Sequence, residues 1–255
     1  MDEITEIISD GPLRIARSEG RSDLLVVSFS GVGRQQWPEP PIEFYRAAKG
    51  AADNPALFVR DLSRSWLNAP GMAERIAHTI EAEAARSGAT RIAAVGNSMG
   101  ATMALILSRM VRFDTVMAFT PQVSVHPDIV PEETQWMGYR DAIRQYRFDR
   151  IDSLPTRRSK IYMLHGDRPS ELIHALRFPK ARGLSHLILP GMGHKLTFAL
   201  KERGVLHDLV SHALAGRSIR YRKLLERQGA LFRTRFEAAQ ADRIAALAMA
   251  RPRAA

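Results

Sequence analysis

A serine lies between two glycines near the centre of the chain, in the pentapeptide GNSMG at residues 96–100, with Ser98 at its centre. The apolar run RIAAV (91–95) comes directly before it, and the apolar sequence ATMALILSRM (101–110) follows. A G-x-S-x-G pattern between a strand and a helix lifts a serine hydroxyl out of a tight turn, because the small residues leave room for that turn. We therefore predict that Ser98 is a nucleophile. A glycine-rich phosphate-binding or packing turn is the alternative.

A serine hydroxyl needs a general base to attack an acyl carbon near neutral pH. His194 is the candidate, because it ends the turn GMGH (191–194) directly after an apolar run at 184–189. The carboxyl ends of parallel strands bring reactive groups to one edge of a sheet. His165 ends another apolar run, and we expect it at the same edge. The remaining histidines fall in predicted helices, in a strand or on the surface.

A carboxylate should orient the base. The apolar run at 160–165 is followed by GDRPSE (166–171), which offers two acids. Asp167 is the first candidate, and Glu171, one helical turn further on, is the second. Either choice gives the chain order serine, acid, histidine that accompanies such a serine turn.

An acyl-transfer site also needs two N–H groups that stabilise the developing oxyanion. Met99 follows the predicted nucleophile at the start of a helix, so its amide is the first candidate. The second is expected in the loop SGVG (30–33) after an early strand, from Gly31 or Val32. Glycine in that loop allows the backbone to approach a substrate closely.

Hydrophobic patterning predicts the elements that must position these residues. Continuous apolar runs, typical of strands buried on both faces, occupy residues 24–30, 56–60, 91–95, 114–119, 160–165 and 184–189. Helical patterns occupy residues 70–87, 101–110 and 195–215. Strands that alternate with helices indicate right-handed crossovers, so we predict an α/β fold with a mostly parallel sheet.

One long segment interrupts this alternation. Residues 121–158 contain four prolines between two predicted strands, and an insertion of this kind often covers a site as a cap. Its aromatic residues either line a pocket or hold the insertion on the body: Trp136, Tyr139 and Tyr146. Its arginines suit an acidic substrate or a solvated face: Arg140, Arg144, Arg147, Arg150, Arg157 and Arg158. We predict one domain over residues 1–216, with the cap at about 121–158, and a helical extension over 217–255.

The net charge of +10 belongs mainly to that extension. Residues 217–255 contain ten basic and three acidic residues, which leaves only +3 for the preceding 216. Apolar residues among the arginines are compatible with binding to nucleic acid or anionic lipid. A solvated arm, or an arm that forms a homo-oligomer, is the more common use of such a segment. Nucleic acid is therefore not the expected partner.

Together these motifs resemble those of the α/β-hydrolase superfamily, over roughly residues 24–215. The resemblance rests on GNSMG around Ser98, an acid after a later strand, GMGH ending at His194, and FSGVG (29–33) after the first long strand. It implies an eight-stranded, mostly parallel sheet, a Ser–His–acid triad, and no metal or organic cofactor. Two departures stand out. The position that carries the acid in the HGxxD pattern of many relatives is Pro169 here, and the HGGG oxyanion motif of some lipases is absent.

Other chemistries lack their residues. The chain has no cysteine, which excludes a thiolate nucleophile and cysteine-based metal sites. It has no H-E-x-x-H, no phosphate-binding P-loop, and no third glycine after Gly31 and Gly33 for a dinucleotide fingerprint. No apolar stretch reaches the length of a membrane span, and the acidic first residues are unlike a secretory signal. We expect a cytoplasmic protein.

These observations predict a serine hydrolase that cleaves a carboxylic ester or thioester through an acyl-enzyme. Its catalytic residues would be Ser98, His194 and Asp167 or Glu171, with no cofactor and a small acyl substrate. One alternative is an acyltransferase with the same site. Another is a non-catalytic protein of this fold whose basic C-terminal arm binds a partner.

Overall fold

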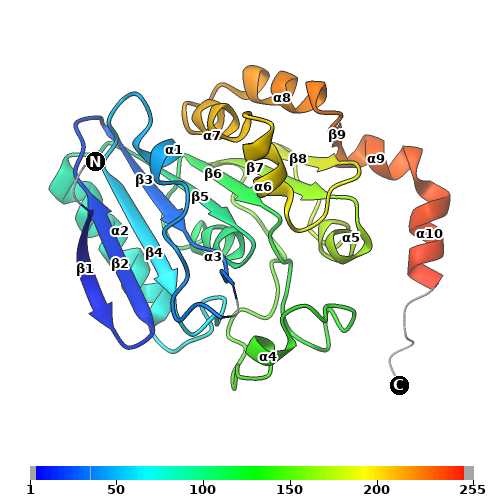
Figure 1. The fold of residues 1–255 in the computed structure, drawn as a ribbon, viewed down its shortest axis with the longest axis horizontal. Helices are drawn as coiled ribbons and strands as arrows, with labels where there is room; N and C mark the ends of the chain where they lie inside the picture. The colour runs from blue at the N-terminus through cyan, green and yellow to red at the C-terminus, as the bar shows by residue number, and fades with distance from the viewer. Residues whose placement is uncertain (1–3, 35, 250–255) are drawn as a thin grey trace.

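The computed structural model describes residues 4–34 and 36–249, which form a twisted sheet with helices on both faces (Figure 1). The sheet of the described residues has nine strands in the order β1-β2-β4-β3-β5-β6-β7-β8-β9. Strands β3 to β8 run parallel, whereas β1, β2 and β9 pair antiparallel with their neighbours. The strands are β1 Ile4–Asp10, β2 Leu13–Ser18, β3 Leu24–Phe29, β4 Ala56–Asp61, β5 Arg91–Asn97, β6 Thr115–Phe119, β7 Lys160–Gly166, β8 Leu184–Leu189 and β9 Leu231–Phe232.

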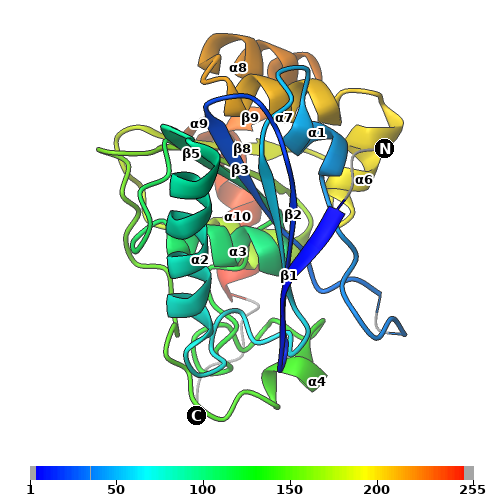
Figure 2. The same ribbon diagram turned by 90° about the vertical axis from the view of Figure 1, so that its left-hand side faces the viewer.

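Helices cover both faces of the sheet (Figure 2). They are α1 Tyr45–Lys49, α2 Met72–Ser87, α3 Met99–Leu107, α4 Met137–Arg140, α5 Pro169–Ala175, α6 Leu196–Glu202, α7 Leu206–Leu214, α8 Ser218–Arg227, α9 Arg233–Ala239 and α10 Ala241–Met249. One face packs against α2 and α3, with Ile76 and Leu105 in its core. The other face packs against α1, α6, α7 and α8, with Leu200 and Leu209 in its core. The two cores fix the sheet, and hence the loops at the carboxyl ends of its strands.

The six strands predicted from apolar runs are all present, and they correspond to β3 through β8. Sequence patterning misses β1, β2 and β9, and the sheet of the described residues has nine strands where the resemblance implies eight. Most residues of β1 are exposed, β2 alternates apolar residues with arginines, and β9 has only two residues. The predicted helix at 195–215 is two helices, α6 and α7. Gly204 lies between them with a φ of 71°, a conformation that favours glycine and interrupts a helix.

The predicted cap is the long connection between β6 and β7, and it contains the short helix α4. Arg140 on α4 is buried, and its guanidinium donates hydrogen bonds to the carbonyl groups of Val125, Val130 and Glu133. This arginine therefore holds the cap together and is not free to bind a substrate. Tyr146 also has a local role, because its hydroxyl donates to the Arg140 carbonyl group at 2.9 Å.

The C-terminal extension packs back onto the body as far as it is described. Tyr221 of α8 is buried with its ring centroid 4.6 Å from that of Tyr162 on β7. Phe236 of α9 is buried in a cluster that includes Ile188 of β8. Arg233 is also buried, and its guanidinium donates to the carbonyl groups of two residues beyond α5. Residues 250–255 of the predicted extension lie outside the described residues.

None of the helices in the described ranges is both long and apolar enough to cross a membrane.

Candidate active site

Ser98 lies in a sharp turn between β5 and α3, with a φ of 54° and a ψ of −123°. A non-glycine residue in this conformation costs on the order of 1–3 kcal/mol, and such strain is concentrated at functional sites. The two glycines make the turn possible. A Cβ atom at Gly96 would lie 2.4 Å from the carbonyl carbon of Gly100, and one at Gly100 would lie 2.1 Å from the carbonyl oxygen of Phe29. Close packing around the turn therefore requires glycine at both positions of the G-x-S-x-G pattern.

The structure brings Ser98, His194 and Glu171 together. The Oγ atom of Ser98 lies 2.8 Å from Nε2 of His194, and Nδ1 of the same ring lies 2.9 Å from Oε1 of Glu171. With a proton on Nδ1, the imidazole donates to the carboxylate and accepts the serine proton at Nε2. Ser98 and Glu171 are each only 3% exposed, so this hydrogen-bonded chain lies largely outside solvent.

Asp167, the first choice for the acid, does not contact His194. Its Oδ1 accepts the N–H of Gly191 at 2.7 Å, and its Oδ2 accepts a hydrogen bond from Arg243 of α10 at 2.8 Å. The carboxylate that reaches the histidine is that of Glu171, so the prediction is corrected on this point. The physical reason is that α5 begins at Pro169, and its first turn directs the Glu171 side chain toward the histidine loop.

Gln122 is not identified by the sequence patterns, although it touches the predicted nucleophile. Its Nε2 donates to Ser98 Oγ at 3.1 Å, while its Oε1 accepts from Trp66 Nε1 at 3.1 Å. Thr102 Oγ1 also donates to Oε1 at 3.1 Å. These two donors fix the oxygen of the amide, so its nitrogen is directed at Ser98. The only signal in the sequence is the position of Gln122, soon after the carboxyl end of β6.

The predicted oxyanion loop lies against the serine turn. A Cβ atom at Gly31 would be 3.1 Å from the Asn97 carbonyl oxygen. The N–H of Gly31 donates to Oε2 of Glu43 at 3.2 Å, so this amide already has an acceptor. Met99 is the first residue of α3, where an amide has no acceptor within its helix. The amide of Met99 is therefore better placed than that of Gly31 to receive an oxyanion.

Glu43 is the carboxylate of this loop. Burial raises its pKa to about 7, against smaller opposing effects of the Gly31 hydrogen bond and the nearby His194. Ser28 Oγ donates to the Glu43 carbonyl oxygen at 2.7 Å, and Ser30 Oγ donates to that of Pro41 at 2.6 Å. These contacts fasten the loop to the end of β3.

Trp136 and His165 differ in their relation to the site. The ring of Trp136, from the cap, meets the ring of His194 edge-on, with 5.6 Å between centroids. His165, expected at the site, is instead fully buried, between the carbonyl oxygen of Pro121 at 2.9 Å and His186 at 3.0 Å. Burial lowers its pKa to about 4, so it is a neutral packing residue at pH 7.

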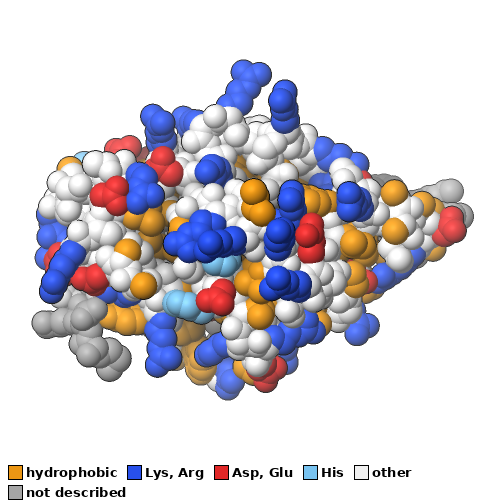
Figure 3. Space-filling view, turned by 90° about the horizontal axis from the view of Figure 1, so that it is seen from above, with side chains coloured by type: hydrophobic (Ala, Val, Ile, Leu, Met, Phe, Trp, Pro, Cys, Tyr) orange, Lys and Arg blue, Asp and Glu red, His pale blue; other side chains and the backbone are white. Residues whose placement is uncertain are grey.

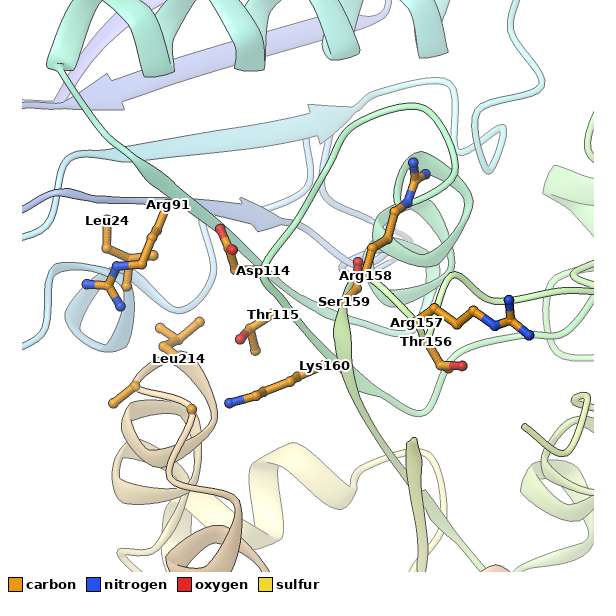
Figure 4. A pocket seen from close by; sticks show the side chains of 12 residues that line it. Leu24, Arg91, Asp114, Thr115, Thr156, Arg157, Arg158, Ser159, Lys160 and Leu214 are labelled. Atoms are coloured by element: carbon orange, nitrogen blue, oxygen red, sulfur yellow. The ribbon is translucent and has the colours of Figure 1, made fainter. Parts of the chain in front are cut away.

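Two cavities lie at different places on the sheet. The larger one, about 1080 Å³, is bordered by Asn97 and Thr197, which lie close in sequence to Ser98 and His194. The smaller one, about 400 Å³, lies at the amino ends of the strands, where Arg91, Thr115 and Lys160 begin β5, β6 and β7 (Figure 4). Neither cavity is lined by Ser98, His194, Asp167 or Glu171 themselves. Across the described residues, no group of three or more metal-ligating side chains is assembled.

No protein-family model and no curated protein matches the sequence. Solved structures do match, at probability 1.00. The capsule O-acetyltransferase of Neisseria meningitidis serogroup A has a TM-score of 0.58 at 14% identity, covering 80% of this chain and 93% of that one. An α/β serine hydrolase without a lid from Xanthomonas campestris has a TM-score of 0.54 at 12% identity, covering 84% and 94%. A proline iminopeptidase-related protein of Thermus thermophilus has a TM-score of 0.52 at 15% identity, covering 84% and 98%.

The fold is therefore that of the α/β-hydrolases, as the sequence predicted. The structurally similar proteins are mostly hydrolases, together with an acetyltransferase. At identities of this size the likeness extends to the fold alone.

Proposed function

We propose that the protein is a serine hydrolase that cleaves a carboxylic ester or thioester. One observation carries the proposal: the unbroken hydrogen-bond path from Ser98 through His194 to Glu171, with steps of 2.8 and 2.9 Å. A strained serine turn is a further support, because a scaffold with no chemistry has no need of it.

In the proposed reaction, Ser98 Oγ attacks the acyl carbon while His194 Nε2 removes its proton. Glu171 stabilises the imidazolium that forms, and the histidine then gives the proton to the leaving alcohol or thiol. Water attacks the resulting acyl-serine, with His194 again as the base, and releases the acid. Gln122 donates to Ser98 Oγ, which leaves the hydroxyl proton directed at the histidine.

The tetrahedral intermediate carries its negative charge on the former carbonyl oxygen. We assign the amides of Met99 and Val32 to this oxygen, since the Gly31 amide has Glu43 as its acceptor. Removing one donor from such a site typically lowers kcat about 10²- to 10³-fold. Glu43 would then act by holding the loop in place.

Acyl transfer is the second candidate, and it is favoured by the structural likeness to a capsule O-acetyltransferase. The acyl-enzyme would be the same, with an acceptor alcohol taking the place of water. The two reactions separate in one assay: a transferase forms a new ester when an alcohol is supplied, whereas a hydrolase releases only the free acid.

The first experiment is labelling with a fluorophosphonate, followed by mass spectrometry of the modified residue. We expect an adduct on Ser98 in the wild type and none in Ser98→Ala or His194→Ala. Exposed residues remote from the site supply the matched controls Ser9→Ala and His78→Ala, which should label as the wild type does. Circular dichroism verifies that each variant is folded.

A folded wild type that does not react would contradict the proposal. An adduct on another serine would contradict the assignment of Ser98. In either case the non-catalytic alternative, in which the basic extension binds a partner, would gain support.

A further inference from the structure

The larger cavity has a half-buried wall and a basic rim. Its wall includes Asn97 and Thr197, whose side chains approach each other with 3.4 Å between Thr197 Oγ1 and Asn97 Oδ1. Aromatic and aliphatic residues also line it: Ile42, Phe44, Phe198 and Leu206. At about 1080 Å³, it exceeds what a short acyl chain needs, since pockets for whole small ligands are roughly 300–1,000 Å³.

Three basic residues line the same cavity, one from each covering helix: Arg46 of α1, Lys201 of α6 and His207 of α7. All three are exposed, and in the described part of the chain Arg46 and Lys201 have no ion-pair partner. Unpaired cations that converge on a cavity create a positive potential there and attract anionic ligands.

The surface around the cavity has the same sign of charge. Figure 3 looks down on the top of Figure 1, where α1, α6, α7 and α8 lie, and Lys and Arg side chains outnumber Asp and Glu over this face. The acidic side chain that lines the cavity is Glu43, whose carboxyl group is turned to the Gly31 amide and partly neutral near pH 7 because burial raises its pKa. It therefore opposes the basic rim only weakly.

We infer that this cavity binds a phosphate group carried by the ester or thioester substrate, at a distance from the bond that is cleaved. The inference rests on the proposed function for the reacting part of the substrate. Arg46 and Lys201 contact the phosphate, and the apolar lining residues pack against the chain that joins the phosphate to the acyl group. A phosphate dianion interacts more strongly with such a rim than a carboxylate does, because it has more charge and more acceptor oxygens.

Two pairs of substrates test this, and each pair differs by a phosphate alone. One pair is acetyl-pantetheine and its 4′-phosphate, and the other is 1-butyrylglycerol and its 3-phosphate. We expect the phosphate to raise kcat/KM in at least one pair, and the pair that responds identifies the thioester or the ester as the substrate type. The gain should shrink as ionic strength rises.

The variant Arg46→Glu/Lys201→Glu should lose that gain, by roughly tenfold for two exposed ion pairs, with little change for the phosphate-free partners. The matched control is Arg220→Glu/Lys223→Glu on α8, which makes the same change in net charge outside the cavity. It should keep most of the gain.

The inference is overturned if neither phosphate raises kcat/KM, or if both double variants lose the gain equally. Calorimetric binding of pantetheine 4′-phosphate against pantetheine separates this failure from failure of the proposed function. If the protein is labelled by fluorophosphonate but shows no preference for phosphate, the hydrolase proposal is supported and the phosphate site is contradicted. If it binds phosphate but is not labelled, the phosphate site is supported and the hydrolase proposal is contradicted.

Discussion

The loop after β7 and the helix that follows it each carry one buried carboxylate, four residues apart, and the two have different partners. Asp167 in the loop accepts hydrogen bonds from the Gly191 amide and the Arg243 guanidinium. Glu171 on α5 meets a titratable ring, that of His194. The first therefore serves the shape of the site, and the second is placed to serve its chemistry.

This difference shows what separates a structural acid from a candidate catalytic acid at the same strand end. The loop at Asp167 is joined tightly to the histidine loop, since the amides of Asp167 and Arg168 both donate to the Met192 carbonyl oxygen, at 3.0 and 3.1 Å. Gly166 lies so near that a Cβ atom there would be 2.1 Å from the same oxygen. Asp167 thus acts on His194 through the backbone, whereas Glu171 acts through the side chain.

The largest expected effect comes from neutralising the two acids separately. Glu171→Gln should lower kcat by about 10³- to 10⁴-fold, because the amide no longer stabilises the imidazolium or holds its tautomer. Asp167→Asn should lower kcat by less than about tenfold, since it does not touch the ring. Steady-state kinetics on a reactive ester measures both, and a larger loss for Asp167→Asn would reverse the comparison.

A smaller effect should follow from removing the partner of Asp167. Arg243→Ala leaves a largely buried carboxylate without its cation, so we expect about 1–3 kcal/mol less stability in urea denaturation. Activity should fall only modestly, through loosening of the histidine loop. The control is Arg235→Ala on α9, an exposed residue of the same extension. Equal stability of the two variants would mean that Arg243 has no such role.

Glu43 is a third carboxylate in this comparison, and we expect its substitution to have the smallest effect on stability. Its pKa is raised from 4.5 to about 7, so between these values the folded state binds more protons than the unfolded state. Stability must therefore fall as the pH rises from about 4.5 to 7, and stay reduced above that.

Glu43→Gln removes this titration. Thermal unfolding at pH 5 and pH 8 should show a larger loss in the wild type than in the variant, on the order of 1 kcal/mol after solvent screening. Parallel behaviour of the two proteins would show that Glu43 titrates in its ordinary range.

The sequence predicts the fold and two of the three hydrogen-bonded site residues, Ser98 and His194, for a physical reason. Ser98 and His194 each follow an apolar strand and lie beside glycines, and these signals are local. The choice between Asp167 and Glu171 is not local, because it depends on where α5 begins and how its first turn is oriented. A pattern of residue types does not say which way the first turn of a helix directs its side chains.

Gln122 and Glu43 could not be found for a related reason. Gln122 acquires its position from Trp66 and Thr102, which come from distant parts of the chain. Glu43 lies in a loop with no motif, and only the folding of that loop onto β3 brings it to Gly31. The basic extension is predicted as a separate arm because most of the net charge of the chain lies in it. Buried apolar residues such as Tyr221 and Phe236 nevertheless determine where it packs.

The short strand β9 has a consequence for the synthesis of the protein. Its two residues pair with Leu187 and Ile188, and so occupy part of the outer edge of β8. A ribosome that has completed β8 has still to produce the segment that covers this edge, and until then the strand offers unpaired backbone groups and apolar surface to other chains. We therefore expect the nascent chain to be prone to aggregate until β9 has been translated and has paired with β8.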